Sequence, residues 1–215
     1  MTDGSKTNIR APCSQSSAIC PLISETKLMY KETENNGTSV EELPAIIRQR
    51  AYNLMFTGKM MCSEAVLSVL NQGIGGGLPP DLAIKMTAGL AEGIGGSGCT
   101  CGALTGGVIS LGLFLSDSAS KPAGRSKVMA ASGRLHHDFK LRFGSTCCRV
   151  LLKNGVPKSG PRFEACCNRG GWAAEQAARM ILAERPELSP LANQPFLRWK
   201  DSRIVVSLKR YFQLF

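Results

Sequence analysis

The sequence has no apolar run long enough to cross a membrane and no segment that resembles a secretory signal. Its longest apolar run, Ala103–Leu115, includes three glycines and is shorter than the roughly 20 apolar residues that a membrane-spanning helix needs. Residues 1–30 lack the apolar core of a signal peptide, and the chain contains no twin-arginine pair. We therefore expect a cytoplasmic protein without a transmembrane segment.

Acidic residues are scarce in the middle of the chain. The whole chain has 26 Lys and Arg against 16 Asp and Glu, which gives a formal net charge of +10. Between Lys121 and Arg169, eleven basic residues stand with only two acidic ones, Asp138 and Glu164. Such a segment attracts an acidic partner protein or an anionic prosthetic group, unless it is simply a solvated face. It contains no recognised nucleic-acid-binding motif, so we expect no nucleic acid partner.

Few segments alternate between apolar and polar residues in the way that strands require, and helical spacing dominates instead. The pattern predicts an all-α fold, a single helical domain of about six to seven helices. The expected helices run from Glu42 to Gly58, from Cys62 to the loop 73–77, from Pro80 to Gly93, from Cys101 to Leu115, from Arg125 to Phe143, from Cys147 to Leu152 and from Cys166 to Ala183.

Composition separates both ends of the chain from the predicted helical domain, residues 42–185. Residues 1–41 are rich in Ser, Thr, Asn and Glu, which predicts a mobile leader; Cys13 and Cys20 lie in it without an assigned role. Residues 186–215 form an extension that is both basic and aromatic. As a helix it would carry an apolar stripe made of Ile204, Leu208, Tyr211 and Phe215. That stripe suits contact with a membrane surface or a partner, and docking on the chain's own domain is the alternative.

Nine cysteines are many for a reducing compartment, where such a set more often indicates metal binding or redox chemistry. Cys62, Cys101 and Cys148 each stand at a predicted helix start, as does the pair Cys166–Cys167. The positive end of a helix favours an anion, so we expect lowered thiol pKa values there. Four inward-facing thiolates match the needs of a metal or iron–sulfur centre. The alternative is that these cysteines are small buried hydrophobic residues.

Other motifs point to rival sites. Residues 93–98 match G-x-G-x-x-G, and Asp117 lies beyond them, as in a dinucleotide-binding fingerprint. That fingerprint requires a strand before Gly93. Residues 80–92 instead have helical spacing, with the apolar residues Leu82, Met86 and Leu90 on one face. Zinc held by four cysteines is a further alternative, although no C-x-x-C pair is present. His136 and His137 lie in the middle of a predicted helix and fit a surface role better than a ligand role.

Four motifs in order carry a resemblance to a known family: Cys62, C-G-A-L-T-G at 101–106, R-F-G-S-T-C-C-R at 142–149, and Cys166-Cys167 before a closing helix. This set resembles the C-GCAxxG-C-C family of small, helical, redox-active proteins over about residues 45–184. It is also similar to the non-haem part of split-Soret cytochrome c, a dimer that carries an iron–sulfur cluster beside its haems.

The resemblance implies a 2Fe–2S or 4Fe–4S cluster on Cys62, Cys101, Cys148 and one of Cys166 and Cys167, with Cys167 taken as the fourth metal ligand. It also implies a homodimer. The chain departs from the split-Soret relative because it has no C-x-x-C-H, so covalent haem is not expected.

The resemblance leaves Cys99, Cys147 and the second member of the 166/167 pair as extra cysteines. They are open to roles as alternative ligands, additional ligands or resolving thiols.

Two functions remain. The first is an iron–sulfur electron carrier that serves a redox partner protein, with acidic character expected of that partner. The second is a thiol–disulfide oxidoreductase that uses low-pKa cysteines without metal.

Overall fold

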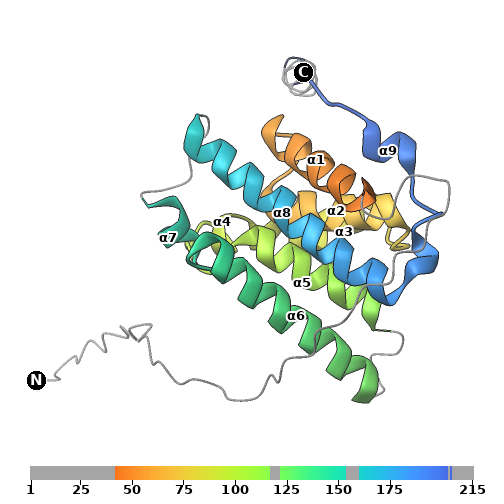
Figure 1. The fold of residues 1–215 in the computed structure, drawn as a ribbon. Helices are drawn as coiled ribbons and strands as arrows, with labels where there is room; N and C mark the ends of the chain where they lie inside the picture. Colours follow the sequence, from red (N-terminus) through yellow and green to blue (C-terminus); the bar gives the residue numbers. More distant parts are fainter. Residues whose placement is uncertain (1–41, 117–121, 154–159, 203, 205–215) are drawn as a thin grey trace, which may run out of the picture. The chain divides into compact units, whose positions relative to one another are not determined.

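The computed structural model describes residues 42–116, 122–153, 160–202 and 204 of the chain. The helices in these ranges are α1 (Glu42–Phe56), α2 (Cys62–Ile74), α3 (Pro80–Thr87), α4 (Ala91–Ile94), α5 (Gly102–Leu115), α6 (Pro122–Phe143), α7 (Cys148–Leu152), α8 (Pro161–Glu184) and α9 (Gln194–Arg198), with 3₁₀ turns η1 (Ala88–Leu90) and η2 (Pro186–Leu188). Within the same ranges the β structure is limited to one isolated antiparallel bridge between Thr100 and Cys147. The predicted all-α class is confirmed (Figure 1).

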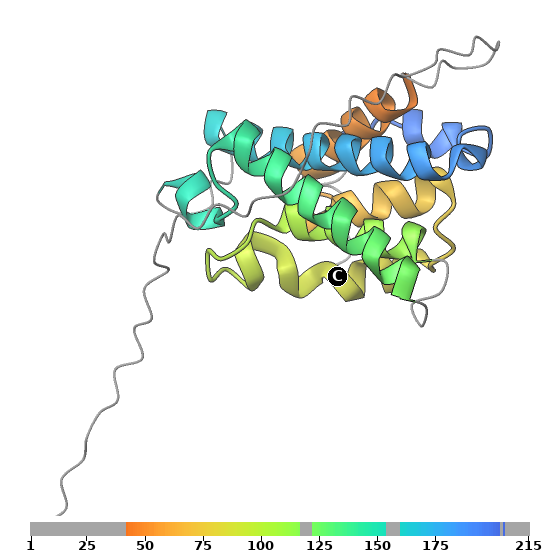
Figure 2. The ribbon, with the colours of Figure 1, turned by 60° about the horizontal axis from the view of Figure 1, so that its bottom comes forward.

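Helix α8 is the element on which the others assemble, because α1, α2, α5 and α6 all contact it. In Figure 1, α1 lies on one side of α8, and α5 and α6 lie on the other. Figure 2 shows α4 and α7 together at one end of the bundle. The cysteine-bearing starts of α5 and α7 therefore lie near one another.

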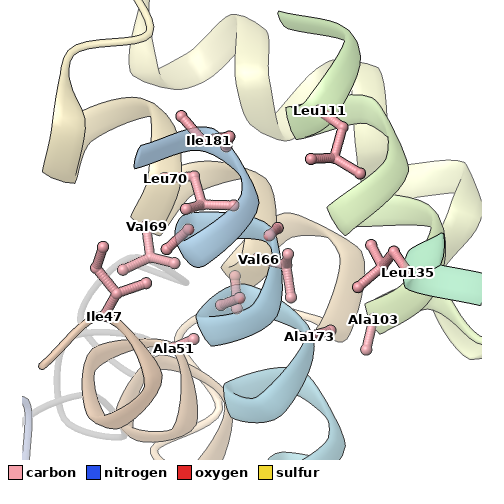
Figure 3. Packing of buried hydrophobic residues seen from close by; sticks show 14 of the residues in the cluster. Ile47, Ala51, Val66, Val69, Leu70, Ala103, Leu111, Leu135, Ala173 and Ile181 are labelled. Atoms are coloured by element: carbon pink, nitrogen blue, oxygen red, sulfur yellow. The ribbon is translucent and has the colours of Figure 1, made fainter. Parts of the chain in front are cut away.

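The core forms where the apolar faces of these helices meet. The cluster combines alanines, such as Ala51 and Ala173, with branched side chains, such as Ile47 and Leu70, and the small residues allow helices to approach closely. Figure 3 shows members of this cluster from all five long helices: Ile47, Ala51, Val66, Val69, Leu70, Ala103, Leu111, Leu135, Ala173 and Ile181.

The contact between α2 and α5 depends on a glycine. A Cβ atom at Gly106 would lie 2.7 Å from the carbonyl oxygen of Ser63 and 3.1 Å from the Cβ of Val66. Real Cβ atoms do not approach backbone oxygens so closely, so a side chain here would push the two helices apart. The absence of a side chain at Gly106 thus brings the first turns of α2 and α5 together.

Several predicted helix ends are confirmed. Helix α2 begins at Cys62, α5 follows directly on Cys101, and α7 begins at Cys148, one residue later than predicted. Helix α6 ends at Phe143 before Gly144, whose φ of 80° is the left-handed conformation of a helix terminator. These cysteines therefore do stand at helix starts.

The third predicted helix is wrong in its extent and in its buried face. The chain forms α3, η1 and α4 in place of one helix up to Gly93. Leu82 and Met86 are 41% and 50% exposed, while the smaller Ala83 and Thr87 are buried. Small side chains let α3 pack closely on α2, where the Ser63 hydroxyl donates a hydrogen bond to the Thr87 carbonyl at 2.9 Å.

Helical turns, not a strand, precede Gly93, so the structural context of a dinucleotide-binding fingerprint is missing there. Glu92, Gly93, Ile94, Gly95 and Gly96 all have positive φ angles between 56° and 78°. This left-handed turn redirects the chain from α4 towards Cys99 and Cys101.

The last core helix begins earlier than predicted. Helix α8 starts at Pro161, after Gly160, so Cys166 and Cys167 lie inside the helix and not at its start. Proline is tolerated in a first turn, where its missing N–H costs nothing. The argument that a positive helix end acts on these two cysteines is therefore wrong.

The segment after α8 packs back on the bundle. The Asn193 N–H donates to the Gly73 carbonyl at 2.9 Å, and Leu197 is buried against α2. Arg50 of α1 forms an ion pair with Asp201 at 2.6 Å. These contacts attach residues 193–201 to α1 and α2.

Some predictions fall on parts of the chain that the structure does not describe. They are the leader 1–41 with Cys13 and Cys20, Asp117, and the stripe residues Leu208, Tyr211 and Phe215. Ile204 is described and is exposed, as are His136 and His137. Among the described helices, none combines the length and the apolar character that crossing a membrane demands.

Candidate functional site

Four cysteines, at the starts of α2, α5 and α7 and within α8, are close enough to affect one another's pKa values. Cys62, Cys101 and Cys148 are buried, and Cys166 is partly buried. The Cys101 thiol interacts electrostatically with the thiols of Cys62 and Cys148, and the Cys166 thiol interacts with those of Cys62 and Cys101. The structure thus sets these four nominated cysteines within electrostatic range of one another, and Cys147 and Cys167 also act on members of the group.

Backbone pairing fixes two of these cysteines relative to each other. The Cys101 N–H donates to the Thr146 carbonyl at 2.8 Å, and the Cys148 N–H donates to the Cys99 carbonyl at 2.6 Å. The loop before α5 is thereby joined to the loop before α7. Cys101 and Cys148 are far apart in sequence, but this pairing sets them side by side.

Two glycines leave room for the sulfur atoms. A Cβ at Gly102 would collide with the Sγ of Cys62, and a Cβ at Gly93 would lie 2.7 Å from the Cβ of Cys148. Gly93 also has a φ of 75°, which few other residues adopt without strain. The glycines around the cysteines therefore permit the close approach that the sequence pattern suggested.

Cys166 and Cys167 face different neighbours. Consecutive residues of an α-helix point about 100° apart, so the two side chains leave α8 in different directions. Partial burial raises the pKa of Tyr52 on α1, and the Cys167 thiol raises it further, which places Cys167 on the α1 side. The Cys166 thiol interacts electrostatically with those of Cys62, Cys101 and Cys167.

The expected lowering of the thiol pKa values is wrong. Burial, with repulsion between neighbouring thiols, raises the pKa of Cys101 to about 12. Burial also raises the pKa of Cys62, although hydrogen bonds from the backbone N–H groups of Glu92 and Ser63 lower it. Burial is also the main cause that raises the pKa values of Cys148 and Cys166. Desolvation of the thiolate outweighs the positive helix end, so these thiols are protonated near neutral pH without a bound cation.

Cys99 and Cys147 lie at the edge of this group. Cys99 is exposed, and the partly buried Cys147 donates its thiol hydrogen to the Gly98 carbonyl at 3.1 Å. The Cys147 thiol also raises the pKa of Cys148. These two cysteines flank the four central thiols on the loops that carry Cys101 and Cys148.

Sequence reasoning missed two charged residues beside the thiols. The charge of Arg169 on α8 lowers the pKa values of Cys148 and Cys166, against the effect of burial. The carboxylate of Glu92 raises the pKa values of Cys62 and Cys148. No motif marks either residue, although Arg169 stands three positions after Cys166 and so shares its helix face.

The central cysteines do not form a site for a single metal ion. In the described ranges, no three or more Cys, His, Asp and Glu side chains lie close enough together to bind one ion. A tetrahedral zinc site is therefore not preformed. In a 4Fe–4S cluster each thiolate binds a different iron, so the four sulfurs stand farther apart than the ligands of a single ion.

Two further observations fit a cluster. The glycines leave space beside the sulfurs, and the Nε of Arg169 is a buried donor with no hydrogen-bond partner. Thiolate ligands surrounded by hydrogen-bond donors are what iron–sulfur centres use. The residues present therefore fit an iron–sulfur cluster.

Comparison with known proteins gives one match. A family model described as "Putative redox-active protein (C_GCAxxG_C_C)" matches residues 60–180, a range that contains all four central cysteines. No curated protein and no solved structure matches the chain.

Proposed function

We propose, from the premise that the chain belongs to the C-GCAxxG-C-C family of redox-active proteins, that it is an electron carrier with an iron–sulfur cluster. Its ligands are Cys62, Cys101, Cys148 and Cys166. The observation that carries the proposal is the convergence of three cysteines: Cys62 lies with its Sγ against Gly102, next to Cys101, and backbone hydrogen bonds join the loops of Cys101 and Cys148. The Cys166 thiol acts electrostatically on this group. Cys166 is taken as the fourth ligand in place of the expected Cys167, because its thiol interacts with those of Cys62 and Cys101 and the Cys167 thiol acts on Tyr52 of α1.

A bound cluster, of the 2Fe–2S or the 4Fe–4S type, supplies reversible one-electron transfer. The protein's own residues hold the thiolates and shield them from water. The raised pKa of Cys101, about 12, means that iron must displace a proton from a buried thiol, so loading releases protons. The apolar surroundings that disfavour a bare thiolate favour a metal-bound one, whose charge the cation neutralises.

The partner in this proposal is an acidic redox protein. Lys140 on α6, Arg149 next to Cys148 on α7 and Lys153 at the end of α7 are all exposed. A cationic surface beside the centre speeds the approach of an anionic protein, and salt screens that attraction. We expect oxidation of the reduced protein by ferricyanide, a small anionic oxidant, to slow as salt rises and after Lys140→Glu. Salt-independent rates would contradict a steering role for this surface.

The competing function is thiol–disulfide exchange without metal. It depends on low-pKa thiols, and the raised pKa values of all four central thiols weigh against it. The same purification distinguishes the two functions, because a metal-free protein whose thiols oxidise reversibly would favour exchange.

The test is iron and acid-labile sulfide analysis of the full chain purified without oxygen. The proposal predicts a brown protein with both elements bound. Cys101→Ser removes a ligand and should abolish the colour, whereas Cys99→Ser changes an exposed thiol at the edge and should retain most of the iron. A colourless wild-type protein without iron would overturn the proposal.

A further inference from the structure

We propose that Arg169 is a positioning residue that donates its Nε–H to a sulfur of the proposed centre and raises its reduction potential. This inference rests on the proposed function. It adds a residue outside the cysteine set, and it assigns that residue a role that can be measured.

The side chain of Arg169 is held from two directions. One of its terminal nitrogens, NH2, donates to the Leu151 carbonyl of α7 at 3.2 Å. Its guanidinium carbon lies 5.8 Å from the centre of the Phe143 ring, at the end of α6. Because the carbonyl and the ring fix the far end of the side chain, the orientation of the Nε–H is fixed as well.

The Nε of Arg169 is buried without a hydrogen-bond acceptor. An unpaired buried donor is unfavourable, and native proteins rarely retain one without a reason. Arg169 stands three residues after Cys166 on α8, and its hydrogen bond to the Leu151 carbonyl holds it against α7, the helix that begins at Cys148. Its charge lowers the pKa values of both cysteines. A sulfur of the bound centre is the acceptor that this donor lacks.

Charge gives the direction of the effect. One-electron reduction of the centre by an added reductant increases its negative charge by one. A fixed guanidinium and an N–H to sulfur bond both stabilise the more negative state, so they raise the potential. Glu92 opposes this effect from the side of Cys62 and Cys148, so the potential reflects the balance of the two charges.

The experiment is a redox titration of the full chain, loaded anaerobically, as wild type and as Arg169→Gln. We expect the one-electron equilibrium to shift at least tenfold towards the oxidised state, about 59 mV towards more negative potential. Arg169→Lys retains the charge without the guanidinium and should shift less. Arg142→Gln is the matched control, because Arg142 is exposed and lies over the same Phe143 ring at 5.6 Å; its potential should stay at the wild-type value.

The outcomes separate the two proposals. A wild-type protein that binds no iron or sulfide overturns the proposed function. A wild-type protein with an intact centre, whose potential is the same in Arg169→Gln, overturns only the role of Arg169. If Arg169→Gln fails to load, the comparison of Arg169→Lys with wild type decides, and an unshifted potential contradicts the inference.

Discussion

Alanine at Gly106 tests the close contact that sets Cys62 beside Cys101. The added Cβ would lie 2.7 Å from the Ser63 carbonyl oxygen and 3.1 Å from the Ser63 Cα. Because backbone atoms cannot rotate away, the helices must separate, and overpacking of this kind costs about 1–3 kcal/mol. Alanine also favours the helix by about 1 kcal/mol relative to glycine. We therefore expect a net destabilisation of up to about 2 kcal/mol.

Gly112, on the same helix, is the matched control. A Cβ there meets nothing within 4 Å, so Gly112→Ala retains only the helix gain and should stabilise the protein by about 1 kcal/mol. The difference between the two variants isolates the clash, about 3 kcal/mol at the upper end. Urea unfolding of the metal-free protein measures both free energies. Equal stability of Gly106→Ala and Gly112→Ala would refute the close approach of α2 and α5.

Three further predictions follow from single features. Burial raises the pKa of Asp201, but hydrogen bonds from Arg50 and Lys59 lower it to below its usual value. The ion pair between Arg50 and Asp201 therefore stabilises the fold above about pH 4, and this stabilisation is lost as pH falls. Asp201→Asn should cost about 3 kcal/mol at pH 7, because it leaves the buried Arg50 charge unpaired, and should flatten acid unfolding curves. The pKa of Cys101, about 12, leaves almost no thiolate at pH 8. In metal-free protein Cys101 should therefore react with iodoacetamide at least a thousandfold more slowly than the exposed Cys99, as followed by mass spectrometry. Equal rates would contradict the raised pKa. Ile94 is 46% exposed and its backbone is strained, because its φ of 65° is left-handed. Ile94→Gly should therefore increase the free energy of unfolding by about 1 kcal/mol, which a thermal melt would show as a higher midpoint.

Local signals explain what could be predicted of the fold. Apolar spacing and glycine terminators indicated the helices, and Gly144 ends α6 as expected. The start of α8 was missed because Pro161–Ala165 has no clear apolar period. The face of α3 was misassigned because Leu82 and Met86 are larger than the Ala83 and Thr87 that are buried. Close helix packing selects small residues, and hydrophobicity alone does not reveal that choice.

The candidate site was predicted in part. The positions of Cys62, Cys101 and Cys148 at helix starts followed from the motif pattern. The direction of the pKa shifts did not, because it depends on how deeply tertiary neighbours bury each thiol. Arg169 was missed for the same reason, since a lone arginine in a basic segment carries no sign of its effect on the pKa of Cys148.

The central claim is that one cluster is held by four specific thiols, and adjacent residues on α8 give its most direct test. Iron and sulfide per chain should be measured for Cys166→Ser and Cys167→Ser, both purified without oxygen. Both substitutions remove one sulfur from the same helix, and they differ in which face they change. The account predicts that Cys166→Ser loses the bound iron while Cys167→Ser retains it. Retention of iron by Cys166→Ser together with its loss in Cys167→Ser would contradict the ligand set.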